Sequence, residues 1–239
     1  MTRQTLWQTI HTALAAEIAA GHYRTGDKLP TEAKLATRFG VNRHTVRQAL
    51  AALAEAGTVH SRRGAGVFVT THPTDYPLGR RVRFQQNLAA SGRSASRRIT
   101  LIDTRVADED EAKALHLLPG DLVHVVEGVS LADNAPLATF RSVFPAAALP
   151  GLPQAVQEHA SITAALGTCG IADYTRAETR ITAKLANPVL ALTLQIAQGA
   201  PILRSVAVNV DQSGRPIEYG TTWFAGDKVA LTVQPEDLT

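Results

Sequence analysis

The sequence is poor in cysteine, and its 239 residues include a single one, Cys169. One cysteine cannot form an internal disulfide, a cysteine-rich zinc site or an iron–sulfur cluster. The chain is therefore expected to fold without disulfides, as proteins of a reducing cytoplasm do. As a catalytic thiol Cys169 is a poor candidate, because a small buried or loop cysteine with no chemical role is far more common.

Long hydrophobic runs are also missing. No stretch approaches the roughly 18 to 20 apolar residues that a membrane-spanning helix needs. The first residues, MTRQTLWQTIHTAL, contain an early arginine but no continuous apolar stretch and no cleavage-like site, so no export signal is expected. The length suffices for one large domain or two small ones, each with its own core. We therefore expect a cytoplasmic protein without a membrane partner.

Acidic residues are scarce in the first part of the chain. Residues 1–98 contain 15 lysines and arginines against 5 aspartates and glutamates, whereas residues 99–239 contain 9 against 16. An excess of positive charge confined to one end favours a polyanionic partner for that end. A solvated basic face without a partner is the alternative interpretation.

The basic part of the chain has the pattern of three helices and a hairpin. Apolar residues recur at helical spacing over residues 5–20, which predicts a first helix. Thr31 can cap a second helix that Gly40 ends, and Asn42 can cap a third that stops at Gly57. The following stretch, TVHSRRGAGVFVT, is typical of a strand, a Gly-rich turn and a second strand. This order predicts a winged helix-turn-helix at residues 1–71.

The organisation changes after this unit. Residues 72–98 are rich in proline, glycine, serine and arginine, and we expect a linker that contains one short helix at about 80–90. From residue 99 on, strand-like runs alternate with short helices.

A weak internal repeat runs through this last part of the chain. Residues 107–140 align with residues 186–220 at an offset of 79, with one added residue. Each copy predicts a helix, a glycine turn and a hairpin, and two copies predict one antiparallel sheet backed by helices at 99–239. The expected fold class of the whole chain is α+β.

Polar side chains are concentrated at the start of the third predicted helix, and no acidic residue stands among them. A capped helix N-terminus exposes backbone N–H groups and partial positive charge. Arginine suits guanine or a phosphate, and asparagine, histidine and threonine suit phosphates or other base edges. The pattern favours insertion into the DNA major groove, with an ordinary charged surface helix as the alternative. The residues are Asn42, Arg43, His44, Thr45 and Arg47.

The Gly-rich turn SRRGAG adds a second basic surface. Arg62 and Arg63 stand at a turn where Gly64 and Gly66 permit close approach of the backbone. A nucleotide-binding loop is a poor alternative, because the sequence contains no GxxxxGK[ST] and no GxGxxG after a strand. The turn therefore predicts a wing that faces phosphates.

The stretch GDKLPTEAKLATRFGVNRHTVRQALAALAEAGTVHSRRGAGVFV resembles the DNA-binding domain of GntR-type transcriptional regulators, and the resemblance covers roughly residues 5–70. It implies double-stranded operator DNA as a partner, and a homodimer on two half-sites. One departure is Ala33, where the family often has arginine or lysine. The predicted DNA-binding residues are Thr31, Glu32, Asn42, Arg43, His44, Thr45, Arg47, Arg62, Arg63, Gly64 and Gly66.

The second half is similar to the HutC branch of GntR regulators in SITAAL and PIEYGTTWFAGD. This similarity implies an effector-binding (UTRA) domain with the fold of chorismate lyase. Within the branch, YPLGRRVRFQQNLAASGR resembles the start of the PhnF group, the regulators of phosphonate-utilisation genes. The implied protein is a cytoplasmic bacterial repressor, on the nucleoid when bound, that responds to a small phosphonate or phosphate.

The same resemblance predicts the residues of the effector site, although a structural role is open for each. Ser161 could simply cap its helix, and Phe84 could belong to the core. Glu218 and Tyr219 alternate along a strand and should face opposite sides, so only one of them is expected to line the pocket. The predicted effector-binding residues are Arg83, Phe84, Asn87, Arg141, Ser161, Thr163 and Glu218.

Two alternatives to this assignment stay open. Sugar-phosphate-sensing members of the branch tend to carry two arginines where this chain has Gly128 and Ser130. That difference argues against an amino-sugar phosphate, but it equally allows a ligand without phosphorus, such as urocanate. A lyase-like enzyme is the more distant alternative, because we find no paired carboxylates, no His/Glu metal spacing and no Ser–His–Asp set. No catalytic residue, metal or cofactor is predicted.

Overall fold

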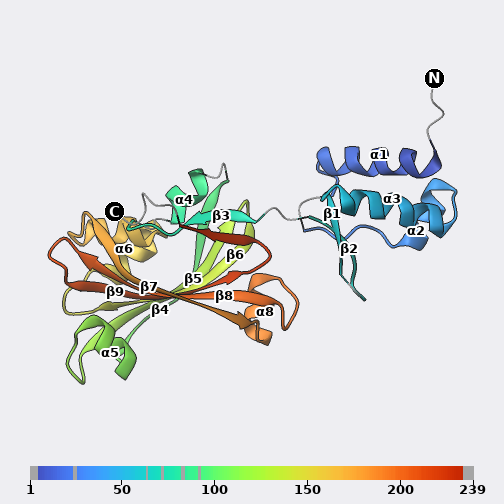
Figure 1. The fold of residues 1–239 in the computed structure, drawn as a ribbon. Helices are drawn as coiled ribbons and strands as arrows, with labels where there is room; N and C mark the ends of the chain where they lie inside the picture. Colours follow the sequence, from blue (N-terminus) through green and yellow to red (C-terminus); the bar gives the residue numbers. More distant parts are fainter. Residues whose placement is uncertain are drawn as a thin grey trace. The chain divides into compact units, whose positions relative to one another are not determined.

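The computed structural model describes residues 5–23, 26–62, 64–70, 73–81, 84–90 and 93–233. The chain forms two compact units, Met1–His72 and Pro73–Thr239, each with a hydrophobic core of its own (Figure 1). Among the described residues, no helix combines the length and the apolar character that crossing a membrane requires.

Three helices form most of the first unit, as the sequence predicts. They are α1 (Leu6–Ala19), α2 (Glu32–Phe39) and α3 (Arg43–Glu55). The two expected caps are present, since Thr31 Oγ1 accepts a hydrogen bond from the Lys34 amide at 3.3 Å, and Asn42 Oδ1 accepts one from the Thr45 amide at 2.9 Å. Gly40 ends α2 in the left-handed region at φ 65°, where a side chain would be strained.

One apolar row from each helix meets in a common core. Leu14 of α1, Leu35 of α2, and Val46 and Leu53 of α3 are fully buried. Burying such a side chain contributes about 1.5–3 kcal/mol. Because this row holds one side of α3 against the other helices, the polar residues at the start of α3 are left on the surface.

The wing is an antiparallel hairpin of β1 (Val59–Arg62) and β2 (Gly66–Val69). The loop between α1 and α2 pairs with β2 through an isolated bridge. There, Lys28 bridges Phe68, and the Leu29 amide donates to the Val67 carbonyl at 2.8 Å. The predicted winged helix-turn-helix is therefore present.

The second unit is built around a six-stranded antiparallel sheet with the order β4-β5-β6-β9-β8-β7. The same series of elements occurs twice in this unit, because β4, α5 and β5 recur 79 residues later as β7, α8 and β8. The two copies meet at the pair β6–β9 in the middle of the sheet. The strands are β4 (Ala95–Val106), β5 (Leu122–Ala132), β6 (Ala135–Pro145), β7 (Tyr174–Leu185), β8 (Pro201–Asp211) and β9 (Pro216–Ala225).

Helices cover both faces of this sheet (Figure 1). The repeat-equivalent helices α5 (Glu109–Leu115) and α8 (Pro188–Leu194) pack on one face. The other face is covered by α4 (Phe84–Ala90), α6 (Leu152–His159) and α7 (Ile162–Thr168). An antiparallel sheet backed by helices agrees with the α+β prediction.

The segment predicted as a linker, residues 72–98, is largely part of the second unit. Its strand β3 (Thr74–Pro77) pairs in parallel with β10 (Val229–Thr232), and β4 begins within it. Three of its side chains, Tyr76, Phe84 and Leu88, are buried in one cluster against the sheet. The prediction gave weight to the proline, glycine and serine content, whereas these three apolar anchors determine where the segment lies.

Candidate functional site

The start of α3 presents a polar surface. Asn42, Arg43 and His44 are exposed, and Thr45 is partly buried. The side-chain oxygen Oδ1 of Asn42 accepts from both the backbone amide and the hydroxyl of Thr45, at 2.9 and 3.0 Å. These two residues therefore hold the helix start together, which leaves Arg43 and His44 extended from a fixed backbone.

Arg47 has an acidic partner that the sequence did not reveal. Its Nε and Nη2 donate to the two carboxylate oxygens of Glu32 at 3.1 and 2.7 Å. These hydrogen bonds lower the pKa of Glu32 and raise that of Arg47. The partner was missed because it lies on α2, 15 positions earlier. Since both groups reach solvent, a phosphate can replace the carboxylate at little cost.

This ion pair leads to a testable expectation. Glu32→Gln removes both the partner of Arg47 and a negative charge from the basic surface, so we expect affinity for random-sequence duplex at low salt to rise about two- to fivefold. Fluorescence anisotropy with labelled duplex measures it. A fall in affinity would instead mean that Glu32 holds Arg47 in the geometry that binds DNA.

Arg62 does not extend freely from the wing. Its Nε donates to His60 Nε2 at 3.1 Å, and its guanidinium lies 5.0 Å from the centre of the Phe68 ring. Gly64 and Gly66 have φ values of 75° and 116°, which explains the glycines of this turn. Arg63 lies outside the residues that the structure describes.

Lys28 is a basic residue beside the wing that the sequence prediction did not include. A Cβ added to Gly66 would lie 2.8 Å from Lys28 Cε, so the lysine side chain lies directly against the turn. The contact follows from the strand-like pairing of the α1–α2 loop with β2, which no local pattern indicates.

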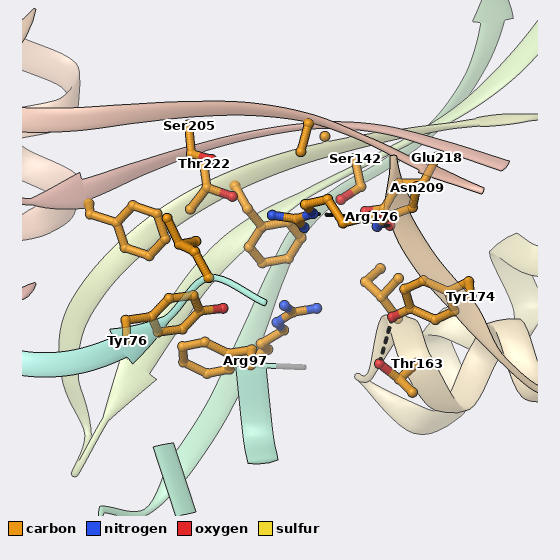
Figure 2. A pocket seen from close by; sticks show the side chains of 17 residues that line it. Tyr76, Arg97, Ser142, Thr163, Tyr174, Arg176, Ser205, Asn209, Glu218 and Thr222 are labelled. Carbon is orange, nitrogen blue, oxygen red and sulfur yellow. Dashed lines mark hydrogen bonds between the residues drawn. The ribbon is translucent and has the colours of Figure 1, made fainter. Parts of the chain in front are cut away.

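A cavity of about 60 Å³ lies in the second unit, on the face of the sheet that α4 and α7 cover. Its lining residues come from strands β3, β4, β6, β7, β8 and β9 and from helices α4 and α7, and Figure 2 shows their side chains. Its polar lining residues are Tyr76, Arg97, Ser142, Thr163, Tyr174, Arg176, Ser205, Asn209, Glu218 and Thr222. The set is mostly hydroxyl donors, with two arginines and one carboxylate.

A hydrogen-bonded chain runs along one side of the cavity. Arg176 Nε donates to Asn209 Oδ1 at 3.2 Å, and Asn209 Nδ2 donates to Glu218 Oε2 at 2.6 Å (Figure 2). Asn209 and Glu218 are both buried. On the α7 side, the Thr163 hydroxyl and the Tyr174 phenol are 2.9 Å apart. These bonds fix the directions of the side chains before any ligand binds.

Arg97 lines the cavity in a different environment. Its guanidinium carbon lies 4.7 Å from the centre of the Phe140 ring and 5.2 Å from that of Phe84. Its Nε is buried, and no hydrogen bond joins it to any residue that the structure describes. A buried donor without a partner is costly, so this N–H is a natural contact for a bound acceptor.

Three of the predicted effector-binding residues, Phe84, Thr163 and Glu218, lie together at the cavity. Phe84 belongs to the core as well. Glu218 and Tyr219 face opposite sides of the sheet as predicted, since Tyr219 packs against the cluster under α5.

The remaining predicted residues are not brought to the cavity by the described structure. Ser161 caps α7, accepting from the Ala164 amide at 3.4 Å, and is not among the lining residues. Arg141 is on the opposite face of the sheet, 3.1 Å from Glu111, because it stands between two cavity-facing residues of β6. Arg83 and the side chain of Asn87 lie outside the described residues.

The sequence prediction missed Arg97, Arg176 and Asn209. The aligned repeat gave no signal for the two arginines, because they lie before its two copies, on the strands β4 and β7, which the structure shows to be 79 residues apart. The carboxylate, histidine and cysteine side chains that the structure describes nowhere gather in a group of three that could hold a metal.

A winged helix with a basic reading surface, joined to a second unit with a polar cavity, defines a ligand-responsive DNA-binding regulator. Residues 6–69 match the bacterial regulatory proteins of the gntR family, and residues 90–230 match the UTRA domain. The chain belongs to the GntR family of transcriptional regulators, in the branch that carries a UTRA domain, and the protein is a regulator rather than an enzyme.

Relatives match along nearly the whole chain. An uncharacterised HTH-type transcriptional regulator of Rhizobium meliloti is 36% identical over 230 residues, which are 96% of this chain and 94% of the relative. The HTH-type transcriptional repressor PhnF of Mycolicibacterium smegmatis is 32% identical over 209 residues, or 87% and 84% of the two chains. The crystal structure of PhnF from Mycobacterium smegmatis aligns with a TM-score of 0.67 at 30% identity, covering 94% of this chain and 98% of that one.

Proposed function

We propose that the protein is a homodimeric repressor of genes for phosphonate uptake or catabolism. In this proposal, α3 and the wing of each protomer bind one half-site of operator DNA, and a small phosphonate or phosphate in the cavity weakens that binding. Two-fold symmetric dimers suit the paired half-sites of helix-turn-helix operators. The similarity to a PhnF protein named as a repressor supports both the pathway and the sign of regulation.

The charge of the cavity carries the effector assignment. The lining contains two guanidinium groups, Arg97 and Arg176, against a single carboxylate, Glu218, and its other polar groups are hydroxyls and one amide. Arginine binds phosphonate, phosphate and carboxylate oxygens with paired hydrogen bonds. Such a lining favours a small anion with a further group that can donate to Glu218.

The surroundings of Gly128 favour an effector other than a sugar phosphate. At Gly128, where sugar-phosphate sensors tend to carry arginine, an added Cβ would lie 2.8 Å from Phe140 Cζ. The Phe140 ring thus fills the space that such an arginine would use.

A gel-shift experiment tests this proposal against its alternatives. The full-length protein is titrated onto DNA from upstream of its own operon and onto random duplex, with methylphosphonate, inorganic phosphate, urocanate or N-acetylglucosamine 6-phosphate added. We expect selective binding that methylphosphonate or phosphate releases. Release by urocanate alone or by the sugar phosphate alone would assign another pathway, and selective binding that none of them alters would contradict the effector assignment.

A further inference from the structure

The two cavity arginines occupy equivalent positions on β4 and β7, the strands that precede the two copies of the internal repeat, yet their surroundings differ. Arg97 of β4 is paired across the sheet with Ser130 of β5, and Arg176 of β7 is paired in the same way with Asn209 of β8. Arg176 follows Arg97 by 79 residues, and Asn209 follows Ser130 by the same offset. The two halves of the cavity therefore allow a direct comparison of what each arginine is bound to.

Arg176 is already engaged by the protein itself. Its Nε donates to Asn209 Oδ1 at 3.2 Å, and the same asparagine donates to Glu218 at 2.6 Å. A ligand that took the Arg176 Nε would have to break this chain and leave the buried Asn209 without its partner.

Arg97 has no such partner. The residue beside it on the neighbouring strand is Ser130, whereas the residue beside Arg176 is Asn209. The Arg97 Nε is buried and unbonded within the described part of the chain. Instead, the rings of Phe140 and Phe84 lie 4.7 and 5.2 Å from its guanidinium carbon. The residue equivalent to Phe140 in the second repeat is Gly220, so Arg176 has no counterpart of this ring.

Gly128 is the residue that makes room for the Phe140 ring. A Cβ at Gly128 would lie 2.8 Å from Phe140 Cζ and 2.5 Å from the Arg98 carbonyl oxygen. A glycine is therefore required where β4, β5 and the ring come together. The ring in turn limits the positions that the Arg97 guanidinium can take.

A guanidinium carries all its N–H groups in its own plane, so it binds an oxyanion along its edge. The rings of Phe84 and Phe140 lie close to the Arg97 guanidinium and limit the directions from which an oxyanion can approach it. We propose that Arg97 alone supplies the oxyanion seat of the effector, with paired N–H···O bonds from Nε and an adjacent Nη. Phe84 and Phe140 are then positioning residues, and Arg176 belongs to the network that orients Glu218. This proposal rests on the proposed function and narrows the ligand to one with a phosphonate, phosphate or carboxylate group.

Three substitutions test the proposal by calorimetric titration of the full-length protein with methylphosphonate. Arg97→Lys keeps the charge but removes the planar pair of donors, and we expect at least a tenfold loss of affinity. Ser130→Asn supplies the amide that Asn209 provides in the other half, and by engaging Arg97 it should cause a similar loss. Phe140→Leu removes the ring and should weaken binding about fivefold or more.

Phe144→Leu is the matched control for Phe140→Leu. Phe144 is on the same strand, in the same core cluster and equally buried, but it does not line the cavity. Its substitution should lower the melting temperature of the protein as much while changing the affinity less than twofold. Equal losses for the two phenylalanine variants would reduce Phe140 to a core residue and overturn its role.

The outcomes separate this proposal from the function on which it rests. If the wild-type protein binds methylphosphonate and the folded Arg97→Lys and Ser130→Asn variants bind it equally well, Arg97 is not the seat, although the proposed function stands. If the wild-type protein binds neither methylphosphonate nor inorganic phosphate nor acetate, the proposal of an anionic effector is wrong, and so is the role proposed for Arg97.

Discussion

Replacing Arg43 by alanine is expected to weaken binding to operator DNA by about 1–3 kcal/mol, a five- to 150-fold loss of affinity. The reason is its position, since Arg43 is exposed on the first turn of a helix whose start is held by the Asn42–Thr45 cap. Because the cap fixes the backbone at the start of α3, only the Arg43 side chain itself has to be ordered when it meets a base edge. Titrations on operator and on random duplex, at several salt concentrations, measure the effect.

The pattern of the loss identifies what Arg43 contacts. A guanine contact predicts a loss on the operator and little change on random duplex, whereas a phosphate contact predicts a loss on both and a salt slope reduced by about one. Arg38→Ala is the control, because it removes the same charge from a side chain bound to Glu17 of α1. Unchanged operator affinity for Arg43→Ala would remove Arg43 from the DNA surface.

Replacing Glu111 by alanine is expected to destabilise the second unit by about 3 kcal/mol, at the lower end for a broken buried ion pair. The Glu111 carboxylate is buried and accepts two hydrogen bonds from Arg105, at 2.7 and 2.8 Å, and one from Arg141 at 3.1 Å. Its loss leaves two arginines uncompensated, and they are only partly exposed. The lower end of the range applies because both still reach some solvent.

Thermal unfolding measures this effect, and a shift of roughly 6–12 °C corresponds to it for a unit of this size. Glu109→Ala is the control, because Glu109 is an exposed residue of the first turn of the same helix. Equal shifts for the two variants would mean that the ion pairs of Glu111 contribute nothing beyond the local helix.

The same carboxylate gives the second unit a defined acid sensitivity. Burial by itself would raise the pKa of Glu111, but hydrogen bonds from Arg105 and from the Asp108 amide outweigh it and lower that pKa. A lowered pKa in the folded state stabilises the fold above the ordinary glutamate pKa, near 4.3. This contribution to the free energy of unfolding should decline as the pH falls below this value. The stability of the Glu111→Ala variant should therefore depend less on pH in this range, which thermal unfolding at several pH values measures.

Features that depend on neighbouring residues could be predicted from the sequence. The caps at Thr31 and Asn42 and the apolar row of α3 all lie within one or two helical turns, so the three helices of the winged helix could be predicted from local patterns. The sheet of the second unit followed from the repeat, whose two copies are the two halves of the sheet. Residues 72–98, predicted as a linker from their composition, instead pack largely within the second unit, because three widely spaced apolar side chains of this segment are buried there.

The site was less predictable, because its residues meet only through the sheet. Arg141 was assigned to the effector although its neighbours Phe140 and Ser142 are the residues that face the cavity. Alternation along the strand, which correctly separated Glu218 from Tyr219, would have excluded Arg141 once one of its neighbours was placed. The pairing of Arg47 with Glu32 joins two helices, so no local pattern carries it.

In the proposed regulator, a ligand in the cavity and operator DNA on the winged helix weaken each other's binding. Linkage requires the two effects to be reciprocal, since each partner can change the affinity of the other only by the same factor. The most direct measurement is the affinity for methylphosphonate, by calorimetry, with and without saturating operator duplex. We predict binding about 5- to 150-fold weaker on the DNA complex, matched by an equal fall in operator affinity at saturating methylphosphonate. The same methylphosphonate affinity with and without operator would contradict the account.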